Sequence, residues 1–528
     1  MTLFGTAGIR GPVATTVTPL LALAVGQAVA TEAPAGDPDS PVVLGYDGRE
    51  TSQTLATAMA AGLSSGGASV RRLGQVPTPA LAYASRGRRG VMITASHNPP
   101  PDNGIKCFAD GVEYDRGAEA AIERAVVPML GDGPALDGEP TQEGEPAHED
   151  EPTQEGESAH EDEPALEGEP AIEDSEENGS TLADWDRWGE IERETVLDEY
   201  REAVCSYVRG QFVADDPGRP LAGLSVAVDC GTGVGGMATP GILDRLGAQV
   251  SAINANVDGH FPARASKPAP ESVTDLAAFL RNGDYDLGLA HDGDADRLVV
   301  LGPDGEIVHE DTVLAVVAAH YVERASETGV ADPVVVTTPN ASARIDELVG
   351  ETGGRVERVR LGALHEGIAR VESERDESPT DESTTDESSA PTVVFAAEPW
   401  KHIHPAFGGW IDGVMSAAVV SALVAEAGDV ETLCDPVEER PYRKVSLPCP
   451  DDAKADVMER LGTDLPNRFP DAGVDTDHGL RLDLNDGDWL LVRPSGTEPY
   501  VRLYAESEEV DELVDEASAA IETAVDGR

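Results

Sequence analysis

Three aspartates at alternating positions carry the strongest chemical signal in the sequence. Asp292, Asp294 and Asp296 lie between two apolar runs and precede Arg297. Carboxylate oxygens are the ligands that hard cations prefer, and three of them after a strand can converge on one ion. A calcium-binding loop would need glycine at position six and glutamate at position twelve, where Arg297 and Pro303 stand. We therefore predict a buried divalent metal site, against the alternative of a solvated acidic turn.

A serine on a turn at the end of a strand is the candidate nucleophile. Ser96 follows the apolar run 91–93, and the prolines at 99–101 stiffen the chain after it. The carboxyl end of a strand is a position from which a hydroxyl can reach a substrate. Most serines are ordinary loop residues, and what favours chemistry here is Lys106, one of five lysines in the chain, near the same turn.

A third segment, near the carboxyl terminus, is rich in groups that bind anions. A strand at 489–492 leads into a turn, and the candidate phosphate-binding residues in and after it are Arg493, Ser495, Gly496, Thr497 and Arg502. Hydroxyls and turn amides can donate to phosphate oxygens, and arginine can bind them bidentately. The alternative is a simple hairpin turn, but two arginines that flank two hydroxyls favour an anion site.

The segment 231–236 satisfies the GxGxxG pattern after a strand and is a weaker signal. A dinucleotide-binding fold would place an acidic residue about 20 positions further on, whereas Asn254 and Asn256 stand there. We interpret this segment as a tight turn between a strand and a helix.

Alternating strands and helices must position these groups. Short β-branched runs are predicted as strands and apolar-periodic segments as helices, in the order strand 42–45, helix 52–62, strand 91–94, strand 224–229, helix 240–246, strand 250–253, helix 273–281, strand 334–338 and helix 342–349. This alternation indicates α/β layers. The end differs, with strand, turn and strand at 480–505 and an acidic helix at 507–525. We predict domains 1–215, 216–310, 311–432 and 433–528.

Composition restricts the partners and the compartment. The net charge of −61 comes from 99 acidic and 38 basic residues and argues against nucleic acid or an anionic membrane as a partner. Two acidic inserts, 139–174 with three 12-residue repeats and 372–391, are predicted to be disordered. Without the 15 carboxylates of the first and the net seven negative charges of the second, the charge would still be −39. Such global acidity with scarce lysine indicates a halophile's protein, and five scattered cysteines indicate a reducing, cytoplasmic compartment.

The motifs together resemble those of the α-D-phosphohexomutase family, which includes phosphoglucomutases, phosphomannomutases and phosphoglucosamine mutases. The resemblance runs from FGTAGIRG at 4–11 through TASHNP at 94–99 and DGDADR at 292–297 to RPSGTEPYVR at 493–502. It implies an α/β fold of four domains around a central cleft. Three similar mixed α/β units would be followed by a smaller α+β domain. It also implies a monomer or homodimer that acts on small sugar phosphates.

The resemblance assigns roles residue by residue. Ser96 would be the phosphorylated residue, and its phosphate would complete the coordination of Mg²⁺ by the three aspartates. Arg10, Lys106 and His97 would be catalytic, and the 493–502 segment would hold the phosphate that does not react. The substrate-binding residues would be Arg297, Glu398, Lys401 and His402. A hexose 1,6-bisphosphate would be both intermediate and activator.

The sequence departs from the family in the loop that would contact the sugar, residues 397–402, which we call the sugar-reading loop. The usual pattern is Gly-Glu-x-Ser-Gly-His, but Trp400 and Lys401 replace the serine and glycine, while Glu398 and His402 match. The preferred hexose phosphate, among glucose, mannose and glucosamine, therefore stays open. The alternatives to a mutase are a serine-phosphate phosphatase, which would pass the phosphoryl group to water, and a non-catalytic sugar-phosphate-binding paralogue.

Overall fold

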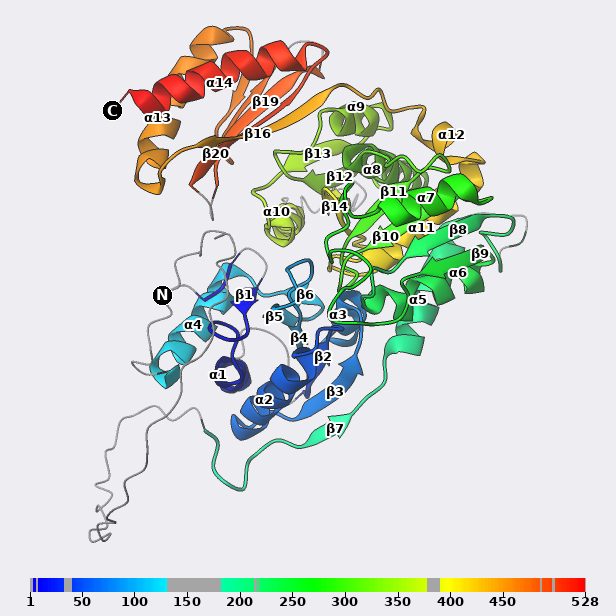
Figure 1. The fold of residues 1–528 in the computed structure, drawn as a ribbon, viewed down its shortest axis with the longest axis vertical. Coiled ribbons are helices and arrows are strands. Elements are labelled where there is room, and N and C mark those ends of the chain that lie inside the picture. Colours follow the sequence, from blue (N-terminus) through cyan, green and yellow to red (C-terminus); the bar gives the residue numbers. More distant parts are fainter. Residues whose placement is uncertain are drawn as a thin grey trace, which may run out of the picture.

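The computed structural model has four β-sheets that follow one another along the chain (Figure 1). It describes residues 3–5, 8–32, 40–130, 182–212, 216, 218–377, 390–484, 487–495 and 499–527. The acidic insert at 139–174 and most of the one at 372–391 lie outside these residues. Within them, no helix combines the length and the apolar character that a membrane span requires.

The first sheet has the order β1-β5-β4-β2-β3-β7, with β6 beside β5. Its elements are β1 Ile9–Pro12, α1 Pro19–Thr31, β2 Val42–Tyr46, α2 Ser52–Ser65, β3 Val70–Gln75, α3 Thr78–Ala84, β4 Arg89–Ile93, β5 Asp102–Ala109, β6 Val112–Glu113, α4 Arg116–Leu130 and β7 Ile191–Arg193. Thr18 caps α1 by accepting the N–H of Leu21, and Pro19 occupies the first turn, where its missing N–H costs nothing. Strand β4 is buried along its whole length, which explains its continuous apolar run.

The second and third sheets share one plan, with orders β11-β10-β8-β9 and β13-β12-β14-β15. In each, three parallel strands are followed by an antiparallel strand at one edge. The elements are α5 Leu197–Gln211, β8 Ser225–Asp229, η1 Val234–Met237, α6 Thr239–Leu246, β9 Gln249–Ile253, α7 Thr274–Asn282, β10 Leu287–His291, β11 Leu298–Leu301, α8 Glu310–Glu327, β12 Asp332–Thr337, α9 Arg344–Glu351, β13 Arg355–Arg358, α10 Leu364–Glu377, β14 Pro391–Glu398, β15 Lys401–Ile403, α11 Gly413–Ala427 and α12 Val430–Cys434.

The fourth sheet is fully antiparallel, with the order β16-β20-β19-β18-β17. Its elements are β16 Tyr442–Pro448, η3 Asp451–Ala453, α13 Lys454–Arg468, β17 Gly473–Asp475, β18 Leu480–Asp483, β19 Trp489–Pro494, β20 Tyr500–Glu506 and α14 Val510–Asp526. Helices α13 and α14 pack together on one face, over a core of their own. The prediction of three related α/β units and a smaller α+β end domain is confirmed.

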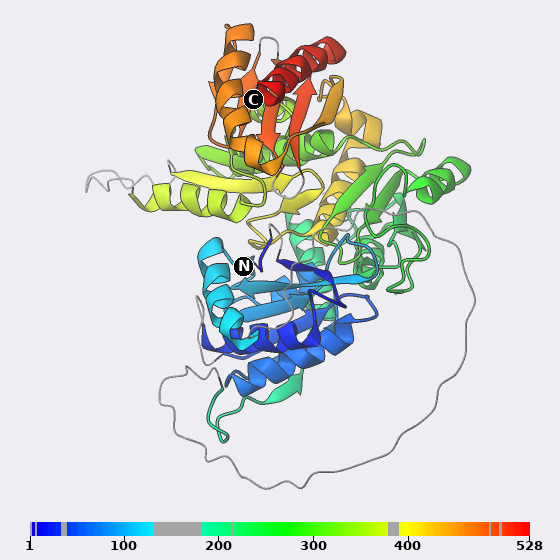
Figure 2. The same ribbon diagram turned by 60° about the vertical axis from the view of Figure 1, so that its left-hand side comes forward.

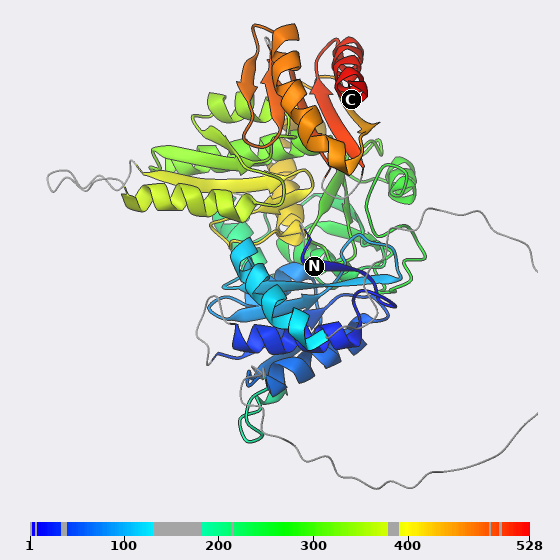
Figure 3. The ribbon, with the colours of Figure 1, turned by 90° about the vertical axis from the view of Figure 1, so that its left-hand side faces the viewer.

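The fourth sheet and the first lie at opposite ends of the molecule, with the second and third between them (Figures 1, 2 and 3). Helix α5 packs against α6 and α11, beyond the first sheet, although the predicted boundary near 215 follows it. The domain boundaries stay predictions. A cavity of ≈ 330 Å³ lies between the first and third sheets, bordered by Glu113, Arg116, Arg360 and His365 among others.

Candidate active site

The same connection in each of the first three sheets carries a predicted site loop. It joins a parallel strand to the antiparallel strand beside it: β4 to β5, β10 to β11, and β14 to β15. These three connections contain Ser96, the three aspartates, and Pro399 with Trp400 respectively. Repeated sheet topology thus presents three chemically different loops in equivalent positions.

The three aspartates converge as predicted. They are buried, and each offers a carboxylate oxygen such that these atoms all lie within 4.8 Å of one another. Ala295 between them has a φ of +60°, which turns the loop back on itself. One oxygen of Asp294 and one of Asp296 are buried and accept no hydrogen bond within the described residues. Orphaned buried carboxylate oxygens in this arrangement fit a hard divalent cation such as Mg²⁺.

The three aspartates, called the triad below, differ in how strongly nearby positive charges stabilise their carboxylates. Burial, together with Asp296 and Asp294, raises the pKa of Asp292 well above its usual range. Burial would also raise the pKa of Asp296, but Lys106, Lys401 and Arg297 hold it well below that range. A cation bound among these carboxylates would offset the burial and the mutual repulsion that raise the pKa of Asp292.

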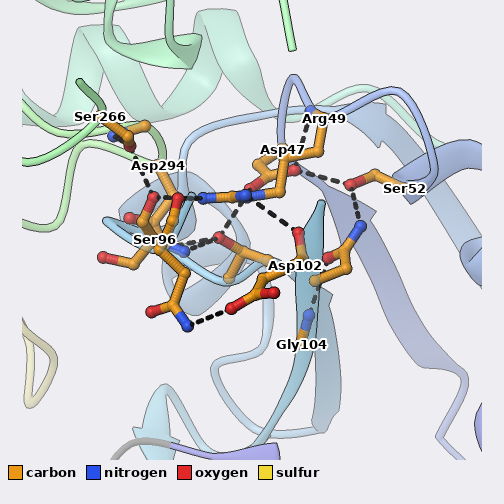
Figure 4. A network of polar contacts seen from close by, with 12 residues as sticks. Asp47, Arg49, Ser52, Ser96, Asp102, Gly104, Ser266 and Asp294 are labelled. Carbon is orange, nitrogen blue, oxygen red and sulfur yellow. Dashed lines mark hydrogen bonds and ion pairs between the residues drawn. The ribbon is translucent and has the colours of Figure 1, made fainter. Parts of the chain in front are cut away.

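Ser96 meets the triad across the boundary between the first two sheets. Its hydroxyl donates to Oδ2 of Asp292 at 2.6 Å, and the residue is fully buried. The backbone N–H of Ser96 donates to Thr94 Oγ1, whose hydroxyl lies 2.8 Å from Asp47 Oδ2 and 3.1 Å from Asp294 Oδ2 (Figure 4). The predicted nucleophile and the predicted metal site are therefore one cluster.

Lys106 supplies the principal positive charge of this cluster. Its Nζ lies 2.9 Å from Asp296, 3.3 Å from Glu113 and 4.0 Å from Asp294. Burial would lower the pKa of Lys106, but these carboxylates raise it well above its usual value. Glu113, on β6, was not predicted, and its only signal in the sequence is its position shortly after the lysine.

Three further predicted residues surround the cluster. Arg10 lies on β1 opposite Gly104 of β5. The Nδ1 atom of His97 lies 3.4 Å from Ser96 Oγ, and burial together with Arg297 and Arg10 lowers the pKa of His97 to about 2, so its ring is neutral. The Nε atom of Arg297 lies 3.8 Å from carboxylate oxygens of both Asp292 and Asp296.

The predicted sugar-reading loop is a tight hairpin turn beside the cluster. Glu398 and Lys401 pair across the hairpin, and Oε1 of Glu398 accepts the N–H of Gly362 at 2.5 Å. Trp400 has a φ of +68°, at a turn position that usually favours glycine. Its carbonyl accepts the N–H of Leu298, so the turn is joined to β11 of the second sheet. Lys401 is half-buried, and burial followed by Arg297 and Lys106 lowers its pKa although Asp296 opposes this.

In the contacts that the structure shows, His402 does not touch the cluster of Ser96 and the three aspartates. Successive residues of a strand face opposite ways, and His402 lies with its Nδ1 3.1 Å from Ser416 of α11 and its ring beside Phe395. Burial lowers the pKa of His402 to about 4. Its role as a substrate ligand stays a prediction.

The predicted phosphate-binding segment lies at the end of the β19–β20 hairpin. Arg493 and Arg502 pair across the two strands, and Arg493 Nη2 donates to the hydroxyl of Tyr504. Ser495 is buried, its Oγ has no partner among the described residues, and its carbonyl accepts from Lys454 Nζ at 2.6 Å. Gly496 and Thr497 lie outside the described residues.

Four of the five lysines of this acidic chain lie at or beside these loops, and the fifth, Lys444, lies on β16. Lys106 contacts the triad, Lys401 is in the sugar-reading loop, and Lys267 Nζ lies 5.7 Å from the ring of Trp400. Lys454 contacts Ser495, and Lys444 Nζ lies 5.5 Å from the ring of Tyr504, the partner of Arg493. In a chain with a net charge of −61, this placement of the lysines fits an anionic substrate.

The glycine-rich segment 231–236 packs against the loop 292–297 that carries the three aspartates, which we call the metal loop. Val234 N–H donates to the carbonyl of Gly293, and a Cβ on Gly233 would lie 2.6 Å from that carbonyl oxygen. The segment is the predicted tight turn from β8 into η1 and α6, and its glycines permit close backbone packing.

Three family models match the chain in succession. They are described as Phosphoglucomutase/phosphomannomutase, alpha/beta/alpha domain I, at residues 1–127; alpha/beta/alpha domain II, at 199–305; and C-terminal domain, at 445–523. Together they cover more than half of the chain, and the Ser96 turn lies in the first match, the triad in the second and the Arg493 turn in the third.

Whole-chain relatives and solved structures agree with these matches. The chain is 35% identical to a protein of Thermococcus kodakarensis named phosphopentomutase, over 96% of this chain and 94% of that protein. It is 33% identical to one of Methanothermobacter thermautotrophicus named "Probable phosphoglucosamine mutase", over 96% and 93%. The fold resembles a phosphoglucomutase/phosphomannomutase family protein from Burkholderia thailandensis (TM-score 0.75, 23% identity, 100% and 98% covered). It also resembles parafusin from Paramecium (TM-score 0.70, 17% identity, 100% and 96% covered).

Proposed function

The chain belongs to the phosphoglucomutase/phosphomannomutase family of phosphosugar mutases, and from this premise we propose that it isomerises sugar phosphates through a phosphoserine at Ser96. One observation carries the proposal. The buried Ser96 hydroxyl donates to Asp292 at 2.6 Å within a cluster of three carboxylates that can hold a cation. A phosphoryl carrier needs this combination, because phosphoryl transfer depends on positioning and on neutralised charge.

The chain's own residues have distinct tasks in the proposed reaction. The phosphorus–oxygen bond to Ser96 breaks as one forms to a free hydroxyl of a sugar monophosphate, and the proton of that hydroxyl ends on the Ser96 oxygen. Lys106 and Arg10 stabilise the negative charge on the transferred group. A Mg²⁺ ion held by the three aspartates would supply further charge neutralisation.

The intermediate in this proposal is a sugar bisphosphate that turns around in the site and returns its other phosphate to Ser96. Arg493, Ser495 and Arg502 would hold whichever phosphate does not react, and the unpartnered Ser495 hydroxyl supports an anion there. A separate C-terminal sheet suits this task, since one phosphate site must accept two orientations of the sugar.

The preferred sugar is proposed to be a hexose, namely glucose, mannose or glucosamine, with Glu398 reading its hydroxyls. A pentose is a second candidate. Trp400 and Lys401 replace the serine and glycine usual in the family, and the Thermococcus kodakarensis relative is named phosphopentomutase.

The test is a comparison of glucose, mannose, glucosamine and ribose 1-phosphates as substrates. Each is supplied with Mg²⁺ and its bisphosphate. We expect isomerisation of at least one to the phosphate on the primary hydroxyl, with activation by bisphosphate. Release of inorganic phosphate in place of isomer would identify a phosphatase, and binding without turnover would identify the non-catalytic alternative.

A further inference from the structure

The backbone carbonyls of the Ser96 turn converge on one buried guanidinium group. Arg49 follows β2, its side chain is fully buried, and it uses all five of its N–H donors. Nε donates to Oδ2 of Asp47 at 3.2 Å, Nη1 to the carbonyls of Pro99 and Asp102 at 2.7 and 2.9 Å, and Nη2 to those of Ser96 and Asn98 at 2.9 and 2.6 Å (Figure 4). Because the guanidinium is planar and rigid, these bonds fix the turn as a unit.

The Ser96 carbonyl is also held from the second sheet's side of the site. Ser266 Oγ donates to it at 2.7 Å and accepts the N–H of Gly293, in the metal loop, at 3.1 Å. The contact is tight, because a Cβ on Gly293 would lie 2.7 Å from Ser266 Oγ and 2.8 Å from the Ser96 carbonyl oxygen. Ser266 therefore joins the serine turn to the metal loop through one hydroxyl.

Ser96 needs such support because its backbone is strained. Its φ is +51°, in the left-handed region that residues with a Cβ rarely adopt. This conformation directs the hydroxyl to Asp292, 2.6 Å away. Without the bonds to its carbonyl, the turn could relax and carry the hydroxyl away from the triad.

We propose that Arg49 and Ser266 are positioning residues that hold the Ser96 oxygen in register with the metal loop for phosphoryl transfer. The inference rests on the proposed role of Ser96 as the phosphoryl carrier. Neither side chain contacts the triad carboxylates or the predicted phosphate-binding segment in the hydrogen bonds that the structure shows. Their loss should therefore slow transfer and leave the affinity for sugar phosphate nearly unchanged.

Two variants and two matched controls test this. Arg49→Lys keeps the positive charge but loses the planar guanidinium group with its five N–H donors. Ser266→Ala removes one hydroxyl. Arg89→Lys is the first control, since Arg89 is equally buried in the same sheet and donates to the carbonyls of Val29 and Ala30. Ser421→Ala is the second control, since Ser421 Oγ donates to a carbonyl within α11.

The measurement is the rate at which Ser96 gains phosphate from glucose 1,6-bisphosphate and Mg²⁺, followed by intact mass over a range of bisphosphate concentrations. Because a misplacement of about 1 Å can cost 10²-fold, the maximal rate should fall about 10²-fold in Arg49→Lys and about tenfold in Ser266→Ala. The half-saturating concentration of bisphosphate in these two variants should change by no more than about twofold. In the two control variants, neither the maximal rate nor the half-saturating concentration should change by more than about twofold. Circular dichroism and thermal midpoints check folding.

The outcomes are distinguishable. A wild-type maximal rate in Arg49→Lys, or a loss confined to the half-saturating concentration, would overturn the positioning role alone. Should Arg49→Lys fail to fold, Ser266→Ala decides, and an unchanged rate there would overturn it. If the wild-type protein gains no phosphate from any of the sugar bisphosphates, the proposed function fails and this inference falls with it.

Discussion

Replacing Lys106 with methionine would test whether the acidic loop depends on a cation. The Lys106 side chain is 1% exposed, and its Nζ lies 2.9 Å from Asp296, 3.3 Å from Glu113 and 4.0 Å from Asp294. Methionine keeps most of the side-chain volume but removes the charge. The buried carboxylates would then repel one another with only Arg297 and Lys401 left nearby as positive charges.

The magnitude follows from these distances. At an effective dielectric constant of about 20, unit charges at the 2.9 Å separation of Lys106 and Asp296 attract by roughly 6 kcal/mol. Desolvation of the ammonium group offsets part of this, and removal of one partner from a buried pair costs about 3–5 kcal/mol. We expect Lys106→Met to lower the free energy of unfolding by that amount in the presence of a chelator.

The assay compares unfolding of the wild type and the variant in chelator and in Mg²⁺. A bound ion stabilises the native state by about 2.7 kcal/mol at 100 times its Kd. In Lys106→Met the ion also relieves repulsion among the carboxylates, so Mg²⁺ should stabilise the variant more than the wild type. Arg344→Met is the control, because it breaks an equally buried pair, with Glu506, at the junction of the third and fourth sheets. It should lose stability and gain no extra benefit from Mg²⁺. An equal gain in all three proteins would refute the reasoning.

Two further predictions concern pH and substrate choice. Burial, with help from Glu310, raises the pKa of Asp311 to about 8, so the stability contributed by its protonated form is full below about pH 4 and is lost as pH rises through 8. The stability of Asp311→Asn relative to the wild type should therefore rise by on the order of 2 kcal/mol between pH 5 and 7, and a difference that is independent of pH would argue against it. Trp400→Ser and Lys401→Gly should change the ratio of kcat/KM for hexose and ribose 1-phosphates by about tenfold, the scale of a changed pocket contact. An unchanged ratio in both would show that this loop does not set the sugar.

Local patterns in the sequence predicted the elements and the loops well, because both depend on neighbouring residues. The apolar runs on either side of the triad became β10 and β11, and the loop between them is buried as expected. The α+β character of the end domain also followed from its strand, turn and strand pattern, although β16 and α13 were not predicted.

Contacts between distant segments could not be predicted in this way. Lys106 and Asp296 are 190 residues apart, and Ser266 reaches Ser96 from 170 residues away. Arg49 has no distinguishing sequence pattern, since four of its five acceptors are brought to it only when β2 and β4 lie side by side. The direction of His402 depends on the strand register after the Pro399–Trp400 turn, which the sequence did not reveal.

The central claim is tested most directly by a single turnover of phosphate through Ser96. The wild-type protein is phosphorylated with the bisphosphate of its best substrate, freed of excess reagent, and mixed with the corresponding sugar monophosphate. We predict one phosphoryl group on Ser96, located by fragmentation mass spectrometry, which is lost as an equal amount of bisphosphate forms, with no inorganic phosphate released. Isomerisation by wild-type protein that never carries phosphate on Ser96, or undiminished activity in Ser96→Ala, would contradict the account.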